Sequence, residues 1–312
     1  MFEPSTLKER RQYYREEWSM NDLPKFITKD IHKREFGFDH YGKGPNDRYK
    51  TFSNKRALKK FLRAKTPFAT YISVAFYNEP RRRQDWQHSE LVFDIDAKDI
   101  PIRSCNCDNV CETCLNESLE LARIYIDTLK GDLGLKNVYL VYSGRGYHIR
   151  VLDQFIMEEE SELRGEILKY ITGADVPTNE IPLGYTNLFI NRLVRNVFHM
   201  TGKEKIEGMN TNLLKDVIKN RDKIEKSKNG NYQLGLFRDK IGPRRYKNFL
   251  DAMARVNLSM VDGKVSIDLK RILRLPSSLH SKVSMKCVEV KNLEKFDPFK
   301  YAVPKFVEER KS

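Results

Sequence analysis

The stretch Glu90-Leu-Val-Phe-Asp-Ile-Asp96, ELVFDID, predicts the clearest β-strand of the sequence. Side chains alternate across a β-strand, so Leu91, Phe93 and Ile95 share one face. The other face carries Glu90, Val92, Asp94 and Asp96. Asp94 and Asp96 are then about 6.6 Å apart along the strand. Two carboxylates on a half-buried strand repel each other unless a cation is present, and oxygen ligands of this kind suit Mg²⁺. A pair of solvated acids is the alternative interpretation.

Four cysteines follow the strand in the pattern C-x-C-x₃-C-x₂-C: Cys105, Cys107, Cys111 and Cys114. Four thiolates within ten residues predict a tetrahedral, structural Zn²⁺ site in a knuckle at 104–116. Two disulfides are disfavoured, because the charged N-terminus is unlike a signal peptide and a reducing compartment is expected. An iron–sulfur cluster usually has other spacing. The remaining Cys287 is expected to be a buried thiol.

Residues 138–151, VYLVYSGRGYHIRV, predict a β-hairpin with the turn SGRG. The two glycines permit a sharp turn and close approach of the backbone to a ligand. Ser143 and Arg145 can bind phosphate oxygens, and His148 shares a strand face with Arg150. Alone, SGRG is only a hairpin turn. Beside the acidic strand, it predicts a site for a triphosphate.

A basic segment, 261–282, predicts a short amphipathic helix over 268–275 that carries Arg274. A solvated basic face is the simpler interpretation of this helix. Asp262 and Asp268 precede the arginine, and either could complete a metal site with the two strand aspartates. Acids, a phosphate-binding turn and basic side chains together match two-metal nucleotidyl transfer.

Composition limits the possible classes of protein. The 312 residues suggest about two domains. No apolar run approaches the ~20 residues of a spanning helix, which excludes a membrane protein, and the 11% aromatic content argues against disorder. The net charge of +14 favours a polyanionic partner such as nucleic acid, with solubility as the alternative reason.

The remaining pattern indicates an α+β fold. The stretch 157–252 is polar and mostly helical, whereas the flanking sequence is rich in strands. The other expected elements are a helix at 7–18 opened by a capping box, a hairpin at 31–53, a helix at 53–64, a strand at 70–77 and a helix at 115–130.

The ordered set ELVFDID, the cysteine cluster, VYSGRGYHIRV and RILRLPSSLH resembles the small catalytic subunit of archaeal and eukaryotic DNA primases, the archaeal members most. The resemblance covers about 30–150 and 253–283. It implies an RRM-like mixed α/β catalytic core with a zinc knuckle and a mostly helical insert. The implied parts are 1–156 for the first part of the core, 157–252 for the insert and 253–312 for the C-terminal part of the core.

The resemblance also implies site residues. Asp94, Asp96 and Asp262 would be catalytic and would bind Mg²⁺ or Mn²⁺, with Asp268 as the alternative third acid. The nucleotide-binding positions implied are Arg48, Ser143, Arg145, His148, Arg274 and His280.

The implied activity is template-directed synthesis of short RNA primers, or also DNA primers, on single-stranded DNA during replication. The implied partners are a large primase subunit in a heterodimer, the template, NTPs or dNTPs, and a replicative polymerase or helicase, with no membrane. The location is then cytoplasmic and nucleoid-associated for an archaeon, or nuclear for a eukaryote. A stand-alone repair or translesion primase-polymerase, and a non-catalytic zinc-bearing nucleic-acid-binding module, are the alternatives.

Overall fold

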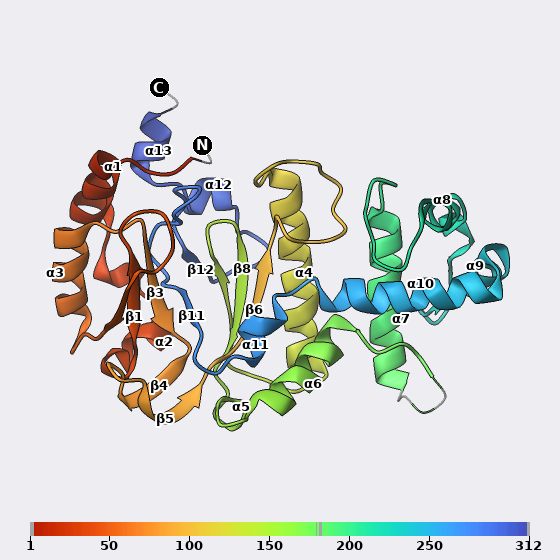
Figure 1. The fold of residues 1–312 in the computed structure, drawn as a ribbon, viewed down its shortest axis with the longest axis horizontal. Helices are drawn as coiled ribbons and strands as arrows, with labels where there is room; N and C mark the ends of the chain where they lie inside the picture. The colour runs from red at the N-terminus through yellow and green to blue at the C-terminus, as the bar shows by residue number, and fades with distance from the viewer. Residues whose placement is uncertain (1–2, 179, 181–182, 311–312) are drawn as a thin grey trace. The chain divides into compact units, whose positions relative to one another are not determined.

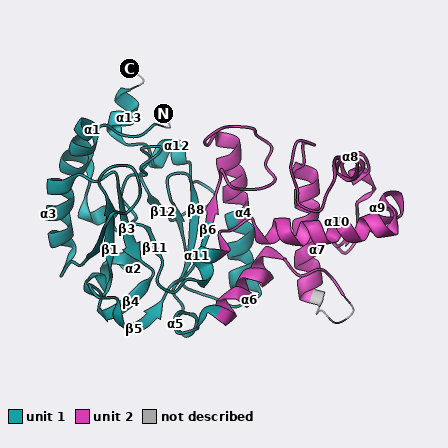
Figure 2. Cartoon of the chain, viewed as in Figure 1, with its two compact units in different colours: residues 1–94, 122–161, 264–312 teal, residues 95–121, 162–263 magenta. Residues whose placement is uncertain are grey.

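The computed structural model describes residues 3–178, 180 and 183–310. They fall into two compact units (Figure 2). Unit 1 combines Met1–Asp94, Ala122–Ser161 and Lys264–Ser312, and unit 2 combines Ile95–Leu121 and Glu162–Gly263. Each unit is therefore assembled from segments that are far apart in the sequence.

Unit 1 contains an antiparallel sheet with the strand order β11-β3-β1-β2. The expected hairpin at 31–53 is confirmed, because β1 pairs with β2 through Phe36 and Lys50. The Phe61 ring of helix α3 lies 4.4 Å from the Phe38 ring of β1, so the helix packs on this sheet (Figure 1). The strands are β1 (Phe36–Asp39), β2 (Asp47–Lys50), β3 (Ala69–Ser73) and β11 (Ile272–Arg274).

A second sheet has the order β12-β7-β8-β6, and a separate hairpin pairs β4 with β5. The predicted strand at 90–96 is confirmed as β6, and its three apolar side chains at 91, 93 and 95 are fully buried. On its other face, Val92 joins a buried cluster with Val74, Val265 and Leu273. The strands are β4 (Ala75–Glu79), β5 (Gln84–Ser89), β6 (Leu91–Asp96), β7 (Val138–Tyr142), β8 (Gly146–Val151) and β12 (Val288–Val290).

Local sequence explains where the helices begin. The predicted capping box is confirmed: the Thr6 hydroxyl accepts from the Glu9 N–H, and the Glu9 carboxylate accepts from the Thr6 N–H. Asn54 caps α3 by accepting from two backbone N–H groups. The helices are α1 (Leu7–Gln12), continued by a π-helix at Tyr13–Glu17, α2 (Lys25–Thr28), α3 (Lys55–Lys65), α4 (Glu112–Gly131), α5 (Gln154–Met157), α11 (Gly263–Ile267), α12 (Pro298–Tyr301) and α13 (Lys305–Glu309).

Unit 2 is built around helices joined by a buried chain of amide contacts. The Asn196 Nδ2 donates to Asn257 Oδ1 at 2.8 Å, and the Asn257 Nδ2 donates to the Gly173 carbonyl at 2.7 Å. These bonds tie α7 and α10 to the end of α6. The elements are α6 (Ser161–Thr172), α7 (Leu183–His199), α8 (Thr211–Lys219), α9 (Gly235–Ile241) and α10 (Pro243–Leu258), with a small hairpin of β9 (Glu225–Lys226) and β10 (Tyr232–Gln233).

Two sequence predictions were wrong. The expected helix at 268–275 does not form: α11 ends at Ile267, and residues 272–274 instead pair with β3 as strand β11. Arg274 therefore projects from a strand. The run at 70–77 is not one strand either, because β3 ends at Ser73 and β4 starts at Ala75, and the two strands belong to different sheets.

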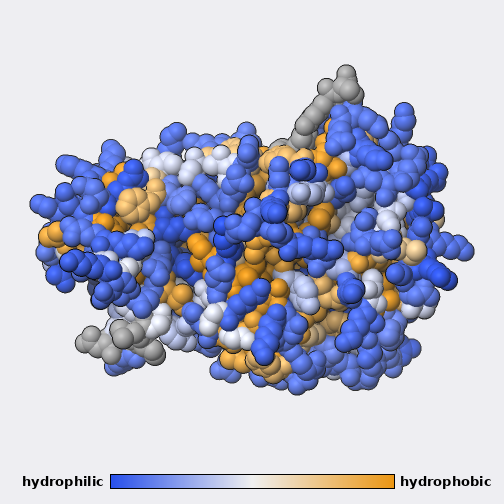
Figure 3. Space-filling view, turned by 180° about the vertical axis from the view of Figure 1, so that it is seen from behind, coloured by the Kyte–Doolittle hydropathy of each residue, from blue (hydrophilic) through white to orange (hydrophobic). Residues whose placement is uncertain are grey.

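Within the described residues, no helix combines the length and apolar character needed to cross a membrane. The face drawn in Figure 3 is mostly hydrophilic, with apolar residues exposed between the polar ones. This surface agrees with a composition in which 32% of the residues are charged.

Candidate active site

The strand β6 presents its first aspartate to a buried histidine. Asp94 Oδ1 lies 3.4 Å from His148 Nε2, and the Asp94 side chain keeps 26% of its surface exposed. Asp94 is the last residue of the first segment of unit 1, whereas Asp96 and Asp262 belong to unit 2. Within unit 1, this contact thus joins one predicted metal ligand to one predicted nucleotide-binding residue.

His148 lies on β8 and is almost fully buried. Burial holds the pKa of His148 well below its ordinary value, and the positive charges of Arg150 and Arg274 lower it further. Its Nδ1 atom is buried and has no hydrogen-bond partner among the described residues. The imidazole is therefore neutral at pH 7 and adds no positive charge beside Asp94.

The predicted SGRG turn joins β7 to β8, and the pairing of Tyr142 with Tyr147 closes it. The Ser143 N–H donates to the Gly146 carbonyl at 2.9 Å. Gly144 has a φ of +100°, a conformation that other residues rarely adopt. The turn is thus held by its own backbone, with Ser143 and Arg145 at its tip.

His280 packs directly against this turn. A Cβ placed on Gly144 would lie 2.5 Å from the Cβ of His280. Burial holds the pKa of His280 well below its ordinary value, and the positive charges of Arg274 and Arg145 add to the effect. The Nδ1 of His280 accepts the Lys282 N–H at 3.1 Å, so the ring proton of the neutral imidazole lies on Nε2. Two neutral, nearly buried histidines thus lie among the positive charges of arginine side chains, a setting that favours an anion.

The structure brings the four predicted cysteines together: the Sγ atoms of Cys105, Cys107, Cys111 and Cys114 all lie within 4.8 Å of one another. The Cys107 and Cys114 Sγ atoms are 3.8 Å apart. Zinc–sulfur bonds of about 2.3 Å in a tetrahedron give a sulfur–sulfur distance of about 3.8 Å. The cluster can therefore hold a zinc ion. Arg103 supports it by donating to the Cys107 carbonyl at 3.1 Å.

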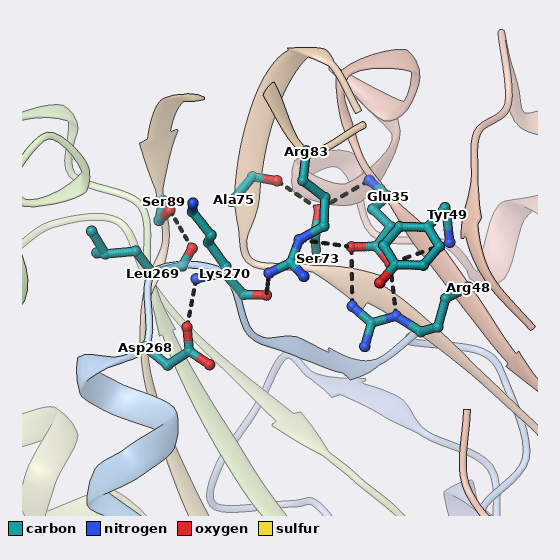
Figure 4. A network of polar contacts seen from close by, with 10 residues as sticks. All are labelled: Glu35, Arg48, Tyr49, Ser73, Ala75, Arg83, Ser89, Asp268, Leu269 and Lys270. Atoms are coloured by element: carbon teal, nitrogen blue, oxygen red, sulfur yellow. Dashed lines mark hydrogen bonds and ion pairs between the residues drawn. The ribbon is translucent and has the colours of Figure 1, made fainter. Parts of the chain in front are cut away.

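Two buried acids that the sequence analysis did not assign to the site, Glu90 and Glu35, form ion pairs with arginines of unit 1. Glu90 is fully buried between Arg34 and Arg150, and each guanidinium lies 2.7 Å from one of its oxygens. Glu35 is also buried and accepts two hydrogen bonds from Arg48, the predicted nucleotide-binding residue (Figure 4). A charged residue next to a buried strand was the only local signal for either acid.

Comparison with known proteins gives the class to which this fold and site belong. Residues 93–291 match the family model described as DNA primase small subunit. The chain belongs to the DNA primase small subunit family, and it is a nucleotidyltransferase, a DNA-directed RNA polymerase of the primase type.

Curated relatives support the family over the whole chain. The chain is 62% identical to the DNA primase small subunit of Methanobrevibacter smithii, with 99% of both chains covered. It is 52% identical to that of Methanothermobacter thermautotrophicus, again with 99% of both chains covered. It is 42% identical to that of Thermococcus kodakarensis, over 97% of this chain and 93% of the relative. The resemblance drawn from the sequence motifs is confirmed.

Proposed function

We propose that this chain is the catalytic subunit of a DNA primase that makes short RNA primers on single-stranded DNA. The 3′-hydroxyl of one nucleotide attacks the α-phosphate of the incoming NTP, a new phosphodiester bond forms, and pyrophosphate leaves. The observation that carries this proposal is the pairing of Asp94 with His148 beside the Ser143–Gly146 turn, in a chain of the primase family.

Asp94, Asp96 and Asp262 are the residues proposed to hold catalytic Mg²⁺ or Mn²⁺. The donor set fits, because carboxylate oxygens are hard ligands and the Asp94 side chain remains partly exposed. Bound there, the cations would activate the 3′-hydroxyl and neutralise charge on the phosphates. Asp268 is the weaker third candidate, since its Oδ1 accepts the Lys270 N–H at 2.9 Å and so closes a local turn.

The basic groups of unit 1 are proposed to bind the triphosphate. Ser143 and Arg145 lie in the turn, and the Nε2–H of His280 is proposed as a donor to a phosphate oxygen. Arg274 contributes positive charge beside both histidines. Anchored by Glu35, Arg48 is proposed as a further nucleotide contact.

Other parts of the proposal concern architecture and partners. We assign the sheets to an RRM-like core made of 1–156 and 253–312, and 157–252 to a helical insert. The cysteine cluster is proposed to bind structural Zn²⁺.

A large subunit is the proposed heterodimer partner, because the relatives are named small subunits. These relatives are archaeal, so we place the reaction at the nucleoid in the cytoplasm, with a polymerase or helicase nearby.

The test is primer synthesis on single-stranded DNA with labelled NTPs and Mg²⁺ or Mn²⁺, with and without the large subunit. Oligonucleotide products are expected, and Asp262→Asn is expected to abolish them while Asp268→Asn retains at least about half of the activity. No product under any of these conditions contradicts the proposal. Full activity without the large subunit would instead favour a stand-alone repair primase-polymerase.

A further inference from the structure

A single buried carboxylate, that of Glu35, anchors two arginines from different parts of unit 1 (Figure 4). Arg48 Nε lies 2.7 Å from Glu35 Oε1 and its Nη2 lies 3.1 Å from Oε2. Arg83 Nε approaches the same Oε2 at 3.6 Å. One negative charge therefore faces two positive charges, and a net positive charge remains at this point. Arg48 has an assigned role in the proposed reaction, whereas Arg83 has none.

Both guanidiniums are held and still reach solvent. The side chains of Arg48 and Arg83 keep 26% and 27% of their surface exposed, while Glu35 is fully buried. An arginine that is fixed by folding loses little further freedom when it binds an anion, so it binds more tightly than a mobile one. Its fork of N–H donors matches the oxygens of a phosphate group.

The turn between β4 and β5 that carries Arg83 is fixed to its surroundings by arginines. Arg83 Nη2 donates to the Lys270 carbonyl at 3.2 Å, and Arg81 Nε donates to Thr51 Oγ1 at 3.3 Å. Arg83 itself has a φ of +55°, which a residue with a side chain adopts only where its surroundings enforce it. Arg82, between these two, has a side chain that is 74% exposed. The turn is thus a rigid basic edge.

An exposed aromatic ring lies beside this edge. Tyr49 follows Arg48 on β2, is 51% exposed and has a φ of +64°. Its backbone N–H donates to Glu35 Oε1 at 3.3 Å, and the Arg48 guanidinium carbon lies 5.6 Å from its ring centre. Positive side chains beside an exposed ring are the combination that binds single-stranded nucleic acid, through phosphates and base stacking.

We propose that Arg83, Tyr49 and the β4–β5 turn bind the single-stranded DNA template, with the guanidinium on a phosphodiester and the ring against a base. This inference rests on the proposed function and adds where on the protein the DNA template binds. Glu35 then anchors a template contact and a nucleotide contact through one carboxylate. Phosphate oxygens could also come from a free NTP, so the experiment separates the two sources.

The test measures the binding of a fluorescent 20-nucleotide oligo(dT) by anisotropy, without NTP, between 50 and 200 mM salt. Arg83→Ala leaves Glu35 paired with Arg48, so no buried charge is orphaned. We expect it to weaken binding about five-fold and to reduce the slope of log K against log salt by about 0.7, the value for one lost phosphate contact. Arg83→Lys is expected to keep the wild-type slope.

Tyr49→Leu, which removes stacking but keeps bulk, is expected to weaken binding about ten-fold without changing the slope. Lys60→Ala, an exposed position on α3, is the charge-matched control and is expected to change binding less than two-fold. The KM for NTP should stay within two-fold of wild type in all four variants, and thermal melting checks that each one folds.

Wild-type affinity and salt slope in folded Arg83→Ala would overturn the proposal. A raised KM for NTP with unchanged oligo(dT) binding would assign the site to the nucleotide instead. The proposed function fails separately: it fails if the wild type makes no primers, even where these substitutions weaken DNA binding.

Discussion

Gly144 and His280 touch so closely that no side chain fits between them: a Cβ on Gly144 would lie 2.5 Å from the Cβ of His280. The residues are far apart in the sequence, and this contact fixes the turn between β7 and β8 against the segment after β11. A displacement of the turn is therefore expected to displace His280 as well.

Replacing Gly144 with alanine should displace His280 and strain the turn, since φ is +100° at this position. We expect Gly144→Ala to raise the KM for NTP at least about ten-fold, a loss of roughly 1.4 kcal/mol. Steady-state primer synthesis measures this. Gly131→Ala, at the end of α4 with no atom within 4 Å of the added Cβ, is the control and should leave the KM unchanged. An unchanged KM in Gly144→Ala would show that the turn does not contact the nucleotide.

Asp94→Asn keeps the size of the side chain but removes its charge. We expect primer synthesis to fall at least about a hundred-fold, because a neutral amide holds a divalent cation poorly. Circular dichroism should show an intact fold, since Asp94 is partly exposed. Asp127→Asn, at an exposed position on α4, is the matched control and should keep full activity. Retention of more than a tenth of the activity in Asp94→Asn would exclude this residue as a metal ligand.

Metal analysis of the purified protein should give about one zinc per chain. Cys114→Ser is expected to lose the zinc and to lower the melting temperature, because Cys114 is the buried member of the cluster. Cys287→Ser removes a buried thiol outside the cluster and should keep the zinc. Full zinc content in Cys114→Ser would contradict the four-cysteine assignment.

The two ends of the described chain are tied by a pH-dependent ion pair. Arg310 donates to both Glu9 oxygens at 2.6 and 2.7 Å, and this holds the pKa of Glu9 at about 2, below its ordinary 4.5. A lowered carboxylate pKa stabilises the fold above pH 4.5, and this contribution is lost as the pH falls toward 2.

We therefore expect Glu9→Gln to melt roughly 2–4 °C below wild type at pH 7, as for a loss of about 1 kcal/mol, and the gap to shrink at pH 3.5. Glu308→Gln on α13 is the control, with no gap at either pH. A gap that stays constant with pH would mean that the pair contributes through packing and not through charge.

Periodicity was sufficient to predict the strands and helices whose burial is regular. The alternation in β6 and the repeat in α4 are local signals, and both elements formed where expected. The spacing of Leu269, Ile272 and Leu273 fits a helix equally well, yet Ile272 pairs with Ser73 of β3. A partner almost 200 residues away overrode the local preference, and no short window of sequence contains that information.

The candidate site divides in the same way. The cysteine spacing is local, and the four sulfur atoms do converge. The contact of Gly144 with His280 and the sharing of Glu35 by two arginines are long-range, so residue type alone could not reveal them. The metal-binding and nucleotide-binding roles stay predictions.

The buried group of Arg34, Glu90 and Arg150 has a consequence for how the chain is made. Glu90 is separated by 56 residues from one arginine and by 60 from the other, and all three side chains are sealed from water. Removing one partner from a buried, hydrogen-bonded group of charges is strongly destabilising. We therefore expect that, during synthesis on the ribosome, the first 90 residues do not reach a stable fold before Arg150 is available. A chain truncated after residue 140 should show no cooperative melting transition, and a sharp transition would show that the early segment folds by itself.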